Sequence, residues 1–389
     1  MQIYQVPITR ILKNCYEEQN KPRDFRWIFF IQERFPGRPF PKKFPEALLI
    51  LQILTRAFAR ESGTAGKSGQ ANIPAGTGNS MKAAIINRFG KAGELQVAEV
   101  DKPVAGDKEV VIKVMAAGVN PVDAKIRAGT HVSSKHLRLP VILGKDVSGV
   151  IASVGKSVTA FQPGDAVFGC IDRTYAEYTL ADPGSLVKKP ATVSFEEAAA
   201  VSLAGLTAYQ AINEQLKVRG GQRVLIQAAA GGVGHLAVQF AKLNGAMVSG
   251  TVSGKNAGFL RELGLDQAID YKREKFEEAA SDLDAVLDAM GGEVLYRSIS
   301  CVKPGGAVVC LPSSAKDDPR AVALALERGV RLTWFMMQPE QESLQLIAGL
   351  LEQGKLKVEV AKVFPLEAIA QAHELVESHG SRGKIVIRI

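Results

Sequence analysis

Residues 228–234, with the sequence AAAGGVG, constrain the fold of this chain more than any other stretch. They separate an apolar run over residues 223–227 from a helical pattern over residues 235–244. A strand that turns directly into a helix leaves free N–H groups and the positive end of the helix dipole facing outwards, and glycine lets a phosphate approach that backbone closely. The stretch therefore predicts a loop that binds the diphosphate of a dinucleotide, although glycine triplets also occur in ordinary strand-to-helix turns.

The residues that follow this loop indicate which dinucleotide is bound. The next apolar run, residues 246–252, ends about twenty residues past the loop, where a Rossmann unit places the residue that reads the adenosine ribose. That position holds no acid, and Ser253 and Lys255 follow instead, with Tyr271 and Arg273 after a third apolar run. Either cation alone is more often an ordinary solvated charge. The missing acid nevertheless favours NADP(H) over NAD(H), because a 2′-phosphate would meet a hydroxyl and cations.

Composition and charge exclude several classes of protein. The 389 residues are 46% hydrophobic and 23% charged, and a chain of this length and composition can form two hydrophobic cores. The formal charge is +8, and most of it comes from residues 1–80, which contain twelve Lys and Arg and six Asp and Glu. The nearly neutral remainder gives no support for nucleic-acid binding. Four scattered cysteines form neither a disulfide framework nor a zinc knuckle, and no apolar run is long enough for a membrane span. We expect a protein of a reducing compartment, namely the cytoplasm.

Residues 1–80 differ from the rest of the chain. Residues 1–60 are basic and carry no enzyme motif, residues 62–80 are small and polar as in a flexible linker, and Met81 follows directly. Three interpretations remain open: a segment that targets an organelle, a docking arm, or upstream sequence translated from a start codon assigned too early. We favour the third, because six acids and few serines argue against a transit peptide.

Two kinds of pattern follow Met81. Short apolar runs divided by Gly, Pro and Asp predict a β-rich, partly closed barrel, and the capping box Ser194–Glu197 begins a helix that we expect to reach about Gln215. Strands and helices then alternate, which predicts a parallel, doubly wound sheet, and a terminal strand over residues 384–389 is expected to return to the first domain. The expected strands of the first part are residues 82–87, 95–100, 109–117, 147–154, 166–168 and 175–180. The expected elements of the second part are residues 224–227, 234–244, 247–252, 256–263, 268–271, 285–290, 308–312, 321–327 and 331–337.

Several ordered motifs resemble the medium-chain dehydrogenase/reductase superfamily. They are residues 117–123 (AGVNPVD), 144–151 (GKDVSGVI), 163–169 (PGDAVFG) and 203–209 (LAGLTAY), and the resemblance covers residues 81–389. Within the superfamily the chain is similar to the zinc-free quinone oxidoreductase branch, which includes zeta-crystallin-like and alkenal/enone reductases. The resemblance implies a GroES-like domain over residues 81–205, an NADP-binding Rossmann domain over residues 206–345, and a return to the first domain over residues 346–389.

The residues themselves argue against a metal. Zinc-dependent relatives carry a Gly-His-Glu segment with a ligand histidine, whereas this chain has Gly144-Lys145-Asp146, and an ammonium group cannot ligate a cation. Cys170 is more simply explained as a small buried hydrophobe. Without a metal, the substrate itself must be electrophilic, as quinones and α,β-unsaturated carbonyls are.

The resemblance also assigns residues to the cofactor site. It implies that the diphosphate contacts Ala230, Gly231, Gly232 and Val233, that the adenosine phosphate contacts Ser253, Lys255 and Tyr271, and that Leu311, Pro312, Phe335 and Met336 flank the nicotinamide. Asn120 is expected near the nicotinamide ribose. Lys125, on an expected strand-to-loop exit, either steadies an enolate oxygen, touches the cofactor or is simply solvated. No histidine has the spacing of a metal ligand or a nucleophile partner.

The expected function is therefore NADPH-dependent hydride transfer to a small quinone or conjugated carbonyl. Two alternatives stay open: a zinc-free alcohol or carbonyl reductase, and a non-catalytic NADPH-binding module, because binding motifs alone do not prove turnover. The resemblance leaves a homodimer open.

Overall fold

The structure, a computed structural model, describes residues 79–378 and 380–389, which all belong to one compact unit, Ala71–Ile389. The expectations for residues 1–78 lie outside the described residues. The strands are β1 (Ser80–Ile86), β2 (Gln96–Asp101), β3 (Val110–Val119), β4 (Val141–Ile142), β5 (Asp146–Val154), β6 (Ala166–Cys170), β7 (Tyr178–Ala181), β8 (Leu186–Lys188), β9 (Arg223–Ile226), β10 (Met247–Val252), β11 (Gln267–Asp270), β12 (Leu283–Asp288), β13 (Val302–Cys310), β14 (Arg331–Trp334), β15 (Val360–Pro365) and β16 (Lys384–Arg388). The helices are α4 (Pro121–Arg127), α5 (Phe195–Tyr209), α6 (Gly234–Leu243), α7 (Ala257–Glu262), α8 (Phe276–Ala279), α9 (Gly292–Ser300), α10 (Pro319–Glu327), α11 (Gln341–Glu352) and α12 (Ile369–Glu377).

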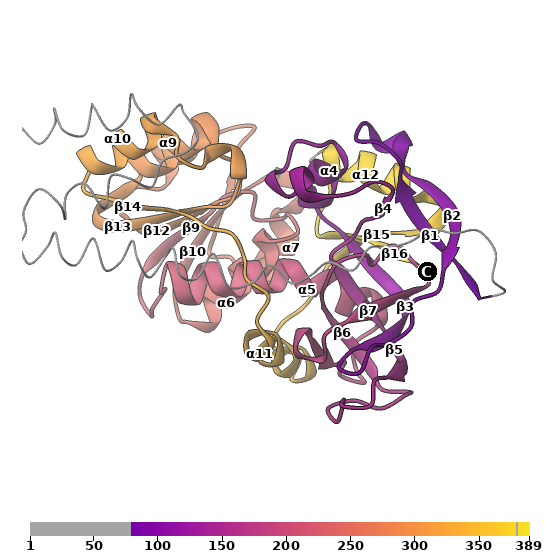
Figure 1. Ribbon diagram of the computed structural model, residues 1–389. Coiled ribbons are helices and arrows are strands. Elements are labelled where there is room, and N and C mark those ends of the chain that lie inside the picture. The colour runs from indigo at the N-terminus through magenta and orange to yellow at the C-terminus, as the bar shows by residue number, and fades with distance from the viewer. Residues whose placement is uncertain (1–78, 379) are drawn as a thin grey trace, which may run out of the picture. The chain divides into compact units, whose positions relative to one another are not determined.

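The second half of the chain forms the predicted doubly wound sheet. Its order is β11-β10-β9-β12-β13-β14, and each neighbouring pair of strands is parallel (Figure 1). Strand order reverses on either side of β9, which is the first strand of this sheet along the chain. All strands therefore end at the same edge of the sheet, where α/β folds bind their ligands.

Alternation along the central strands explains why both faces of this sheet are covered. Val224 and Ile226 of β9 belong to the core that contains residues of α5 and α6, whereas Leu225 belongs to the core that contains residues of α9 and α10. Successive side chains of a strand point to opposite faces, so a strand buried on both faces is apolar throughout. The parallel Rossmann fold is confirmed.

The first part of the chain and its C-terminal end share a second, mainly antiparallel sheet. Its order is β15-β16-β3-β5-β6-β8, with β7 paired to β3, and a smaller sheet has the order β2-β1-β4. Strand β16 pairs antiparallel with β3 in a register that sets Ile385 opposite Val119. This GroES-like, β-rich architecture agrees with the prediction, and the register brings the chain's last strand next to the start of α4.

Helix α5 contacts both parts of the fold. Its capping box forms as predicted, since Glu197 N–H donates to Ser194 Oγ at 3.1 Å and Ser194 N–H donates to Glu197 Oε2 at 2.9 Å. The helix packs on β3, β5 and β6 of the GroES-like sheet and on α6 of the Rossmann part. The helical run reaches Gln215 as expected, but the α-helix itself ends at Tyr209 and a π-helical segment, Gln210–Gln215, continues it. The buried side chain of Gln210 bonds both to the backbone N–H and to the backbone C=O of Gln338, which fixes the point where the helix changes.

The expected strand-to-loop exit at Lys125 is also wrong, because Lys125 lies on helix α4. Asn120 caps this helix, Pro121 occupies its first turn, and Asp123 completes a capping box by accepting the N–H of Asn120 at 2.9 Å. Proline is favoured at the first position of a helix, where its missing N–H has no intrahelical partner to lose. The motif that carries the family resemblance is therefore also a helix start.

Candidate active site

The predicted cofactor residues follow the carboxyl ends of the Rossmann strands. Residues 228–233 follow β9, Ser253 and Lys255 follow β10, and Tyr271 follows β11. Leu311 and Pro312 follow β13, and Phe335 and Met336 follow β14. Because these strands are parallel and adjacent, the structure brings all of these residues to one edge of the sheet. Asn120 and Lys125 belong to α4 of the GroES-like part.

The phosphate loop is tightly folded. Ala228 has a positive φ of 52°, and its carbonyl accepts the N–H of Gly231 at 2.9 Å. A Cβ on Gly234 would lie 2.3 Å from the carbonyl oxygen of Ala228, so only glycine fits where the loop enters α6. Helix α6 starts at Gly234, and its first N–H groups and dipole face the loop. This cradle fits a dinucleotide diphosphate.

His235 links the phosphate loop to the segment that contains Glu359. Its Nδ1 donates to the carbonyl of Gly231 at 2.8 Å, and its Nε2 accepts the backbone N–H of Glu359 at 3.2 Å. Burial lowers the pKa of this fully buried imidazole to about 4, so the ring is neutral at neutral pH. The sequence had offered no role for His235, because its donor partner, Glu359, lies in a distant segment of the chain.

The expected adenosine end of the site contains an acid, Asp270, that was not predicted from the sequence. Tyr271 is 57% exposed, and its backbone N–H donates to Val252, which brings the ends of β10 and β11 together. A Cβ on Gly254 would lie 2.7 Å from Oδ2 of Asp270, so this carboxylate adjoins the segment that carries Ser253 and Lys255. The expectation that no acid lies near the 2′-phosphate therefore holds for the end of β10 only, because Asp270 at the end of β11 lies close to it.

That carboxylate has cationic and N–H partners of its own. Asp270 Oδ1 accepts the backbone N–H of Lys272 at 3.1 Å, and its Oδ2 lies 3.7 Å from Nε of Arg273. The side chains of Lys255 and Arg273 are both exposed, so they are accessible to a bound anion and to solvent. The net charge around Ser253 is thus set by residues of two strands rather than one.

The expected nicotinamide end is built from two neighbouring strand ends. The N–H of Leu311 donates to Asp288, and the N–H of Phe335 donates to Cys310. The indole Nε1 of Trp334 donates to the carbonyl of Pro312 at 3.0 Å. Leu311, Pro312 and Phe335 are half-buried and apolar, which suits the edge of an aromatic ring.

A buried polar cluster lies next to the loop, and the sequence analysis missed its central residue, Lys384. The Lys384 ammonium donates to Asn120 Oδ1, to the carbonyl of Val119 at 3.3 Å and to Asp146 Oδ2 at 3.2 Å. Asn120 Nδ2 also donates to Asp146 at 2.8 Å. A Cβ on Gly232 would lie 2.8 Å from Lys384 Cδ, so the lysine stem passes against the phosphate loop. Lys384 therefore links Asn120 of the GroES-like part to the loop of the Rossmann part.

Behind Asn120 lies a second buried carboxyl. Asp123 accepts a hydrogen bond from the Tyr175 hydroxyl at 3.0 Å. Burial, and then the negative charge of Asp146, raise the pKa of Asp123 to about 6. At 1% exposure this carboxyl is not open to a substrate, so it fixes the start of α4.

Two lysines and a histidine lie near α4. Burial, and then the charges of Lys125 and Lys145, lower the pKa of His131. Lys145 forms an ion pair with Asp172 at 2.5 Å, whereas Lys125 is half-buried on α4.

Cys170 is buried, and burial raises its thiol pKa well above the ordinary value. Within residues 79–378 and 380–389, no three His, Cys, Asp or Glu side chains are arranged to hold a metal ion.

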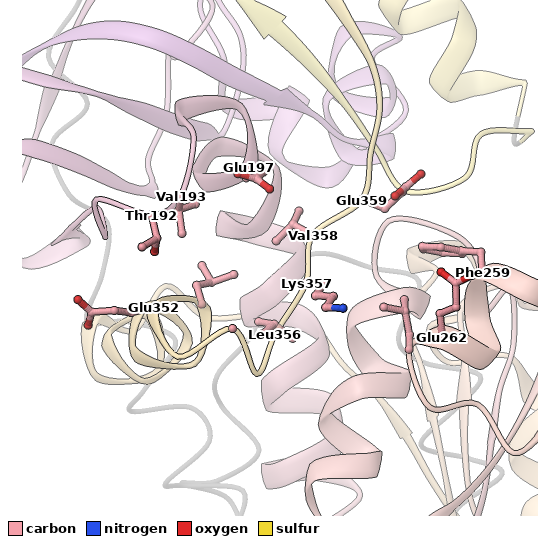
Figure 2. Close-up of a pocket in the computed structure, with 13 residues that line it drawn as sticks. Thr192, Val193, Glu197, Phe259, Glu262, Glu352, Leu356, Lys357, Val358 and Glu359 are labelled. Carbon is pink, nitrogen blue, oxygen red and sulfur yellow. The ribbon is translucent and has the colours of Figure 1, made fainter.

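A cavity of about 500 Å³ lies elsewhere, against the first turn of α5, helix α7 and residues 354–359 (Figure 2). It contains none of the predicted cofactor residues. Glu197, Glu262, Glu352 and Glu359 line it together with Lys357, a negative balance that would repel a dinucleotide diphosphate. The lining of this cavity therefore does not fit a dinucleotide diphosphate.

The fold and the sheet-edge site define a two-part oxidoreductase that binds a nicotinamide cofactor, and comparisons with known proteins agree. The family described as "Alcohol dehydrogenase GroES-like domain" matches residues 106–201, and the family described as "Zinc-binding dehydrogenase" matches residues 263–387. The quinone oxidoreductase of Lama guanicoe is 32% identical over 324 residues, which cover 79% of this chain and 97% of the relative. Tomato (Solanum lycopersicum) 2-methylene-furan-3-one reductase is 34% identical over 325 residues, 79% of each chain.

Solved structures give the same result. The quinone oxidoreductase of Coxiella burnetii has a TM-score of 0.76 at 37% identity and covers 80% of this chain and 100% of that one. The Escherichia coli quinone oxidoreductase in complex with NADPH has a TM-score of 0.73 at 27% identity, covering 79% and 100%. The chain belongs to the quinone oxidoreductase type of the medium-chain dehydrogenase/reductase superfamily, and it is an NAD(P)H oxidoreductase. Among the described residues, no helix is long and apolar enough to cross a membrane.

Proposed function

We propose that this protein transfers a hydride from NADPH to a quinone or an α,β-unsaturated carbonyl without the help of zinc. The observation that carries the proposal is the sheet edge itself, where a glycine loop follows β9 and a hydroxyl and a cation, Ser253 and Lys255, follow β10. A relative solved with NADPH and relatives named quinone oxidoreductase and 2-methylene-furan-3-one reductase support the cofactor and the substrate class.

The chemistry needs little from the protein beyond positioning and the exclusion of water. When bound, NADPH supplies the hydride, and a conjugated acceptor takes it at an electron-poor carbon while negative charge develops on the carbonyl oxygen. Leu311, Pro312 and Phe335 would hold the nicotinamide ring, and Asn120 would bind near its ribose. Lys125 would stabilise the developing oxyanion, which then takes a proton from solvent.

Independence from zinc follows from the chemistry of one position. Lys145 stands where zinc enzymes have a ligand histidine, and its ammonium has no lone pair to offer a metal. The matched family named for zinc binding covers residues 263–387, which include neither Lys145 nor Cys170. The scattered cysteines suit a reducing compartment, and we propose the cytoplasm.

A comparison of kcat/KM for NADPH and NADH tests the cofactor. We expect the wild-type enzyme to prefer NADPH, and Ser253→Glu combined with Lys255→Ala to weaken NADPH far more than NADH, because like charge then faces the 2′-phosphate. Arg261→Ala, which removes an exposed cation from α7, is the control and should leave the ratio unchanged. Asp270→Asn should raise the preference for NADPH. A wild-type preference for NADH, or an unchanged ratio in the double variant, would refute the proposed phosphate pocket.

A screen of NADPH oxidation with quinones, 2-alkenals, cyclic enones and simple aldehydes tests the substrate class. Turnover of quinones or conjugated carbonyls is expected. Turnover of simple aldehydes alone would favour the alternative of a zinc-free alcohol or carbonyl reductase. Tight NADPH binding without oxidation across the whole panel would favour a non-catalytic NADPH-binding module.

A further inference from the structure

Four polar side chains close to the phosphate loop are almost fully buried and come from four different segments of the chain. Gln227 follows β9, Thr251 is in β10, Asp288 ends β12 and Ser298 is in α9, and their exposures are 2%, 4%, 0% and 0%. Burying a polar group is unfavourable unless it is hydrogen-bonded, so four such groups at the binding edge of a sheet need an explanation. Neither the capping of helices nor the apolar cores account for them.

These side chains form one chain of hydrogen bonds with a single direction. Thr251 Oγ1 accepts the backbone N–H of Ala228 at 3.0 Å and donates to Gln227 Oε1 at 2.8 Å. Gln227 Nε2 donates to Ser298 Oγ at 3.1 Å, and Ser298 donates to Asp288 Oδ2 at 2.8 Å. Each hydroxyl accepts one bond and donates one, and the chain ends on a carboxylate. Bonds arranged head to tail in this way polarise and strengthen one another.

One end of the chain is the first residue of the phosphate loop. Ala228 has φ of 52°, a left-handed conformation that is unfavourable for a residue with a side chain. Its carbonyl accepts the N–H of Gly231 and packs against Gly234, so the backbone conformation of Ala228 sets the course of the loop. The hydrogen bond from the Ala228 N–H to Thr251 therefore fixes the residue that sets the direction of the loop.

The other end is a loop beside the expected nicotinamide position. Asp288 Oδ1 accepts the backbone N–H groups of Met290 at 2.9 Å and Gly291 at 2.7 Å. A Cβ on Gly291 would lie 3.5 Å from Pro312, one of the residues expected to flank the nicotinamide. The chain of bonds thus runs from the phosphate loop to the expected nicotinamide end of the cofactor site.

We propose that Gln227, Thr251, Ser298 and Asp288 act as one positioning relay that holds the phosphate loop ready for the cofactor diphosphate. The inference rests on the proposed function, because it takes the loop as the diphosphate site. None of the four side chains needs to touch the cofactor. Because the diphosphate is common to both cofactors, the relay raises affinity for NADPH and NADH by the same factor.

Dissociation constants for NADPH and NADH, measured by nucleotide fluorescence on the full chain, test the relay. Thr251→Val keeps the branched shape but removes the hydroxyl, and we expect both constants to rise about tenfold with their ratio unchanged, since the partly buried N–H of Ala228 loses its acceptor. Thr251→Ser keeps the hydroxyl and should bind as the wild type does. Ser249→Ala is the matched control, because this residue of the same strand donates to the exposed Gln267 at 2.8 Å, away from the loop.

A double variant tests whether the four residues act as a unit. Thr251 and Ser298 are joined through Gln227, so Thr251→Val combined with Ser298→Ala should weaken binding no more than the more severe single variant does. Thermal unfolding of the cofactor-free variants separates loss of fold from loss of positioning. If the two effects multiply, or if Thr251→Val binds both cofactors like the wild type, the relay is overturned. A wild-type preference for NADH would refute the proposed cofactor and leave the relay standing, whereas a wild type that binds neither nucleotide would overturn both.

Discussion

The ammonium of Lys384 lies 3.2 Å from Oδ2 of Asp146, and these side chains are only 4% and 0% exposed. The pair joins the last strand of the chain to β5, next to Asn120 and the phosphate loop. A buried ion pair need not be more stable than a well-packed apolar pair, but removing one partner leaves an uncompensated charge inside the protein. Two measurable consequences follow, one for folding and one for the cofactor.

Lys384→Met should lower the free energy of unfolding by about 3–5 kcal/mol, because Asp146 then keeps its charge without a cation. Denaturant unfolding at neutral pH measures this, and cofactor affinity should fall as well, since Lys384 also holds Asn120. The control is Lys82→Met, which removes a 3.6 Å ion pair to Glu367 at the surface and should unfold like the wild type. Equal stabilities for the two variants would contradict the role given to Lys384.

The second prediction concerns acid stability. His373 is fully buried, and neither of its ring nitrogens has a hydrogen-bond partner among the described residues. Burial, and then the charge of Arg127, lower its pKa to about 3. A lowered pKa means that the unfolded chain takes up a proton first, so stability is present above about pH 6.5 and is lost as the pH falls towards 3. His235, with a pKa of about 4, acts in the same direction. Asp123, with its raised pKa of about 6, acts in the opposite direction, because its contribution is lost as the pH rises.

His373→Phe should therefore reduce the loss of stability between pH 7 and pH 5 by about 2 kcal/mol. The phenyl ring can keep the edge-to-face contact with Tyr175, where the ring centroids are 5.7 Å apart. The change is measured by thermal or denaturant unfolding at both pH values. His136→Asn alters an exposed histidine and should leave the pH dependence unchanged. An identical pH dependence in wild type and His373→Phe would show that His373 does not titrate as inferred.

The third prediction is that the purified protein contains far less than one zinc per chain and keeps its activity in a chelator, because Lys145 replaces a ligand histidine. Elemental analysis measures the metal, and the NADPH oxidation assay measures activity before and after treatment. About one zinc per chain, lost together with activity, would end the zinc-free proposal.

Residues 1–80 lead to the fourth prediction. A chain that starts at Met81 should unfold at the same temperature and turn over at the same rate as the full chain. The pairing of β1 with β2 runs from Ser80 to Ile85, so the shorter chain loses one pair of six and keeps the buried residues from Met81 onwards. A large loss of stability or rate would show that the removed residues contribute to the enzyme.

How far the sequence predicts the structure depends on whether the signal is local. Strand β10 was expected at residues 247–252 and has those bounds, and the Ser194–Glu197 capping box forms, because both signals lie within a few neighbouring residues. Helix α4 was missed even though Asn120, Pro121 and Asp123 carry a helix start, since the motif was taken as a family marker only.

The central residues of the site could not be found in this way. A lysine at the start of an apolar strand looks like a solvated charge, and only the pairing of β16 with β3 brings Lys384 to Asn120. The same holds for Asp270, which reaches Gly254 because β10 and β11 are parallel neighbours. Register and strand order are properties of the whole sheet, so residues far apart in the chain meet without any local signal.

The fifth prediction tests the role of Lys125 against its neighbour. Hydride addition to a conjugated carbonyl leaves negative charge on the oxygen, and a fixed cation nearby stabilises the transition state more than the bound substrate. Lys125 is half-buried on α4, five residues from Asn120, whereas Lys145 is already paired with Asp172. We expect Lys125→Met to lower kcat for enones roughly a hundredfold with little change in KM.

Lys145→Met is the matched control, because it removes a nearby ammonium that is already ion-paired with Asp172, and its kcat should stay close to that of the wild type. A second readout does not depend on activity. The charge of Lys125 is one cause of the lowered pKa of His131, so Lys125→Met should move the NMR titration of His131 to higher pH. If kcat falls equally in both variants, or if Lys125→Met changes neither kcat nor the His131 titration, then Lys125 is only a solvated surface charge and the oxyanion is stabilised by another group.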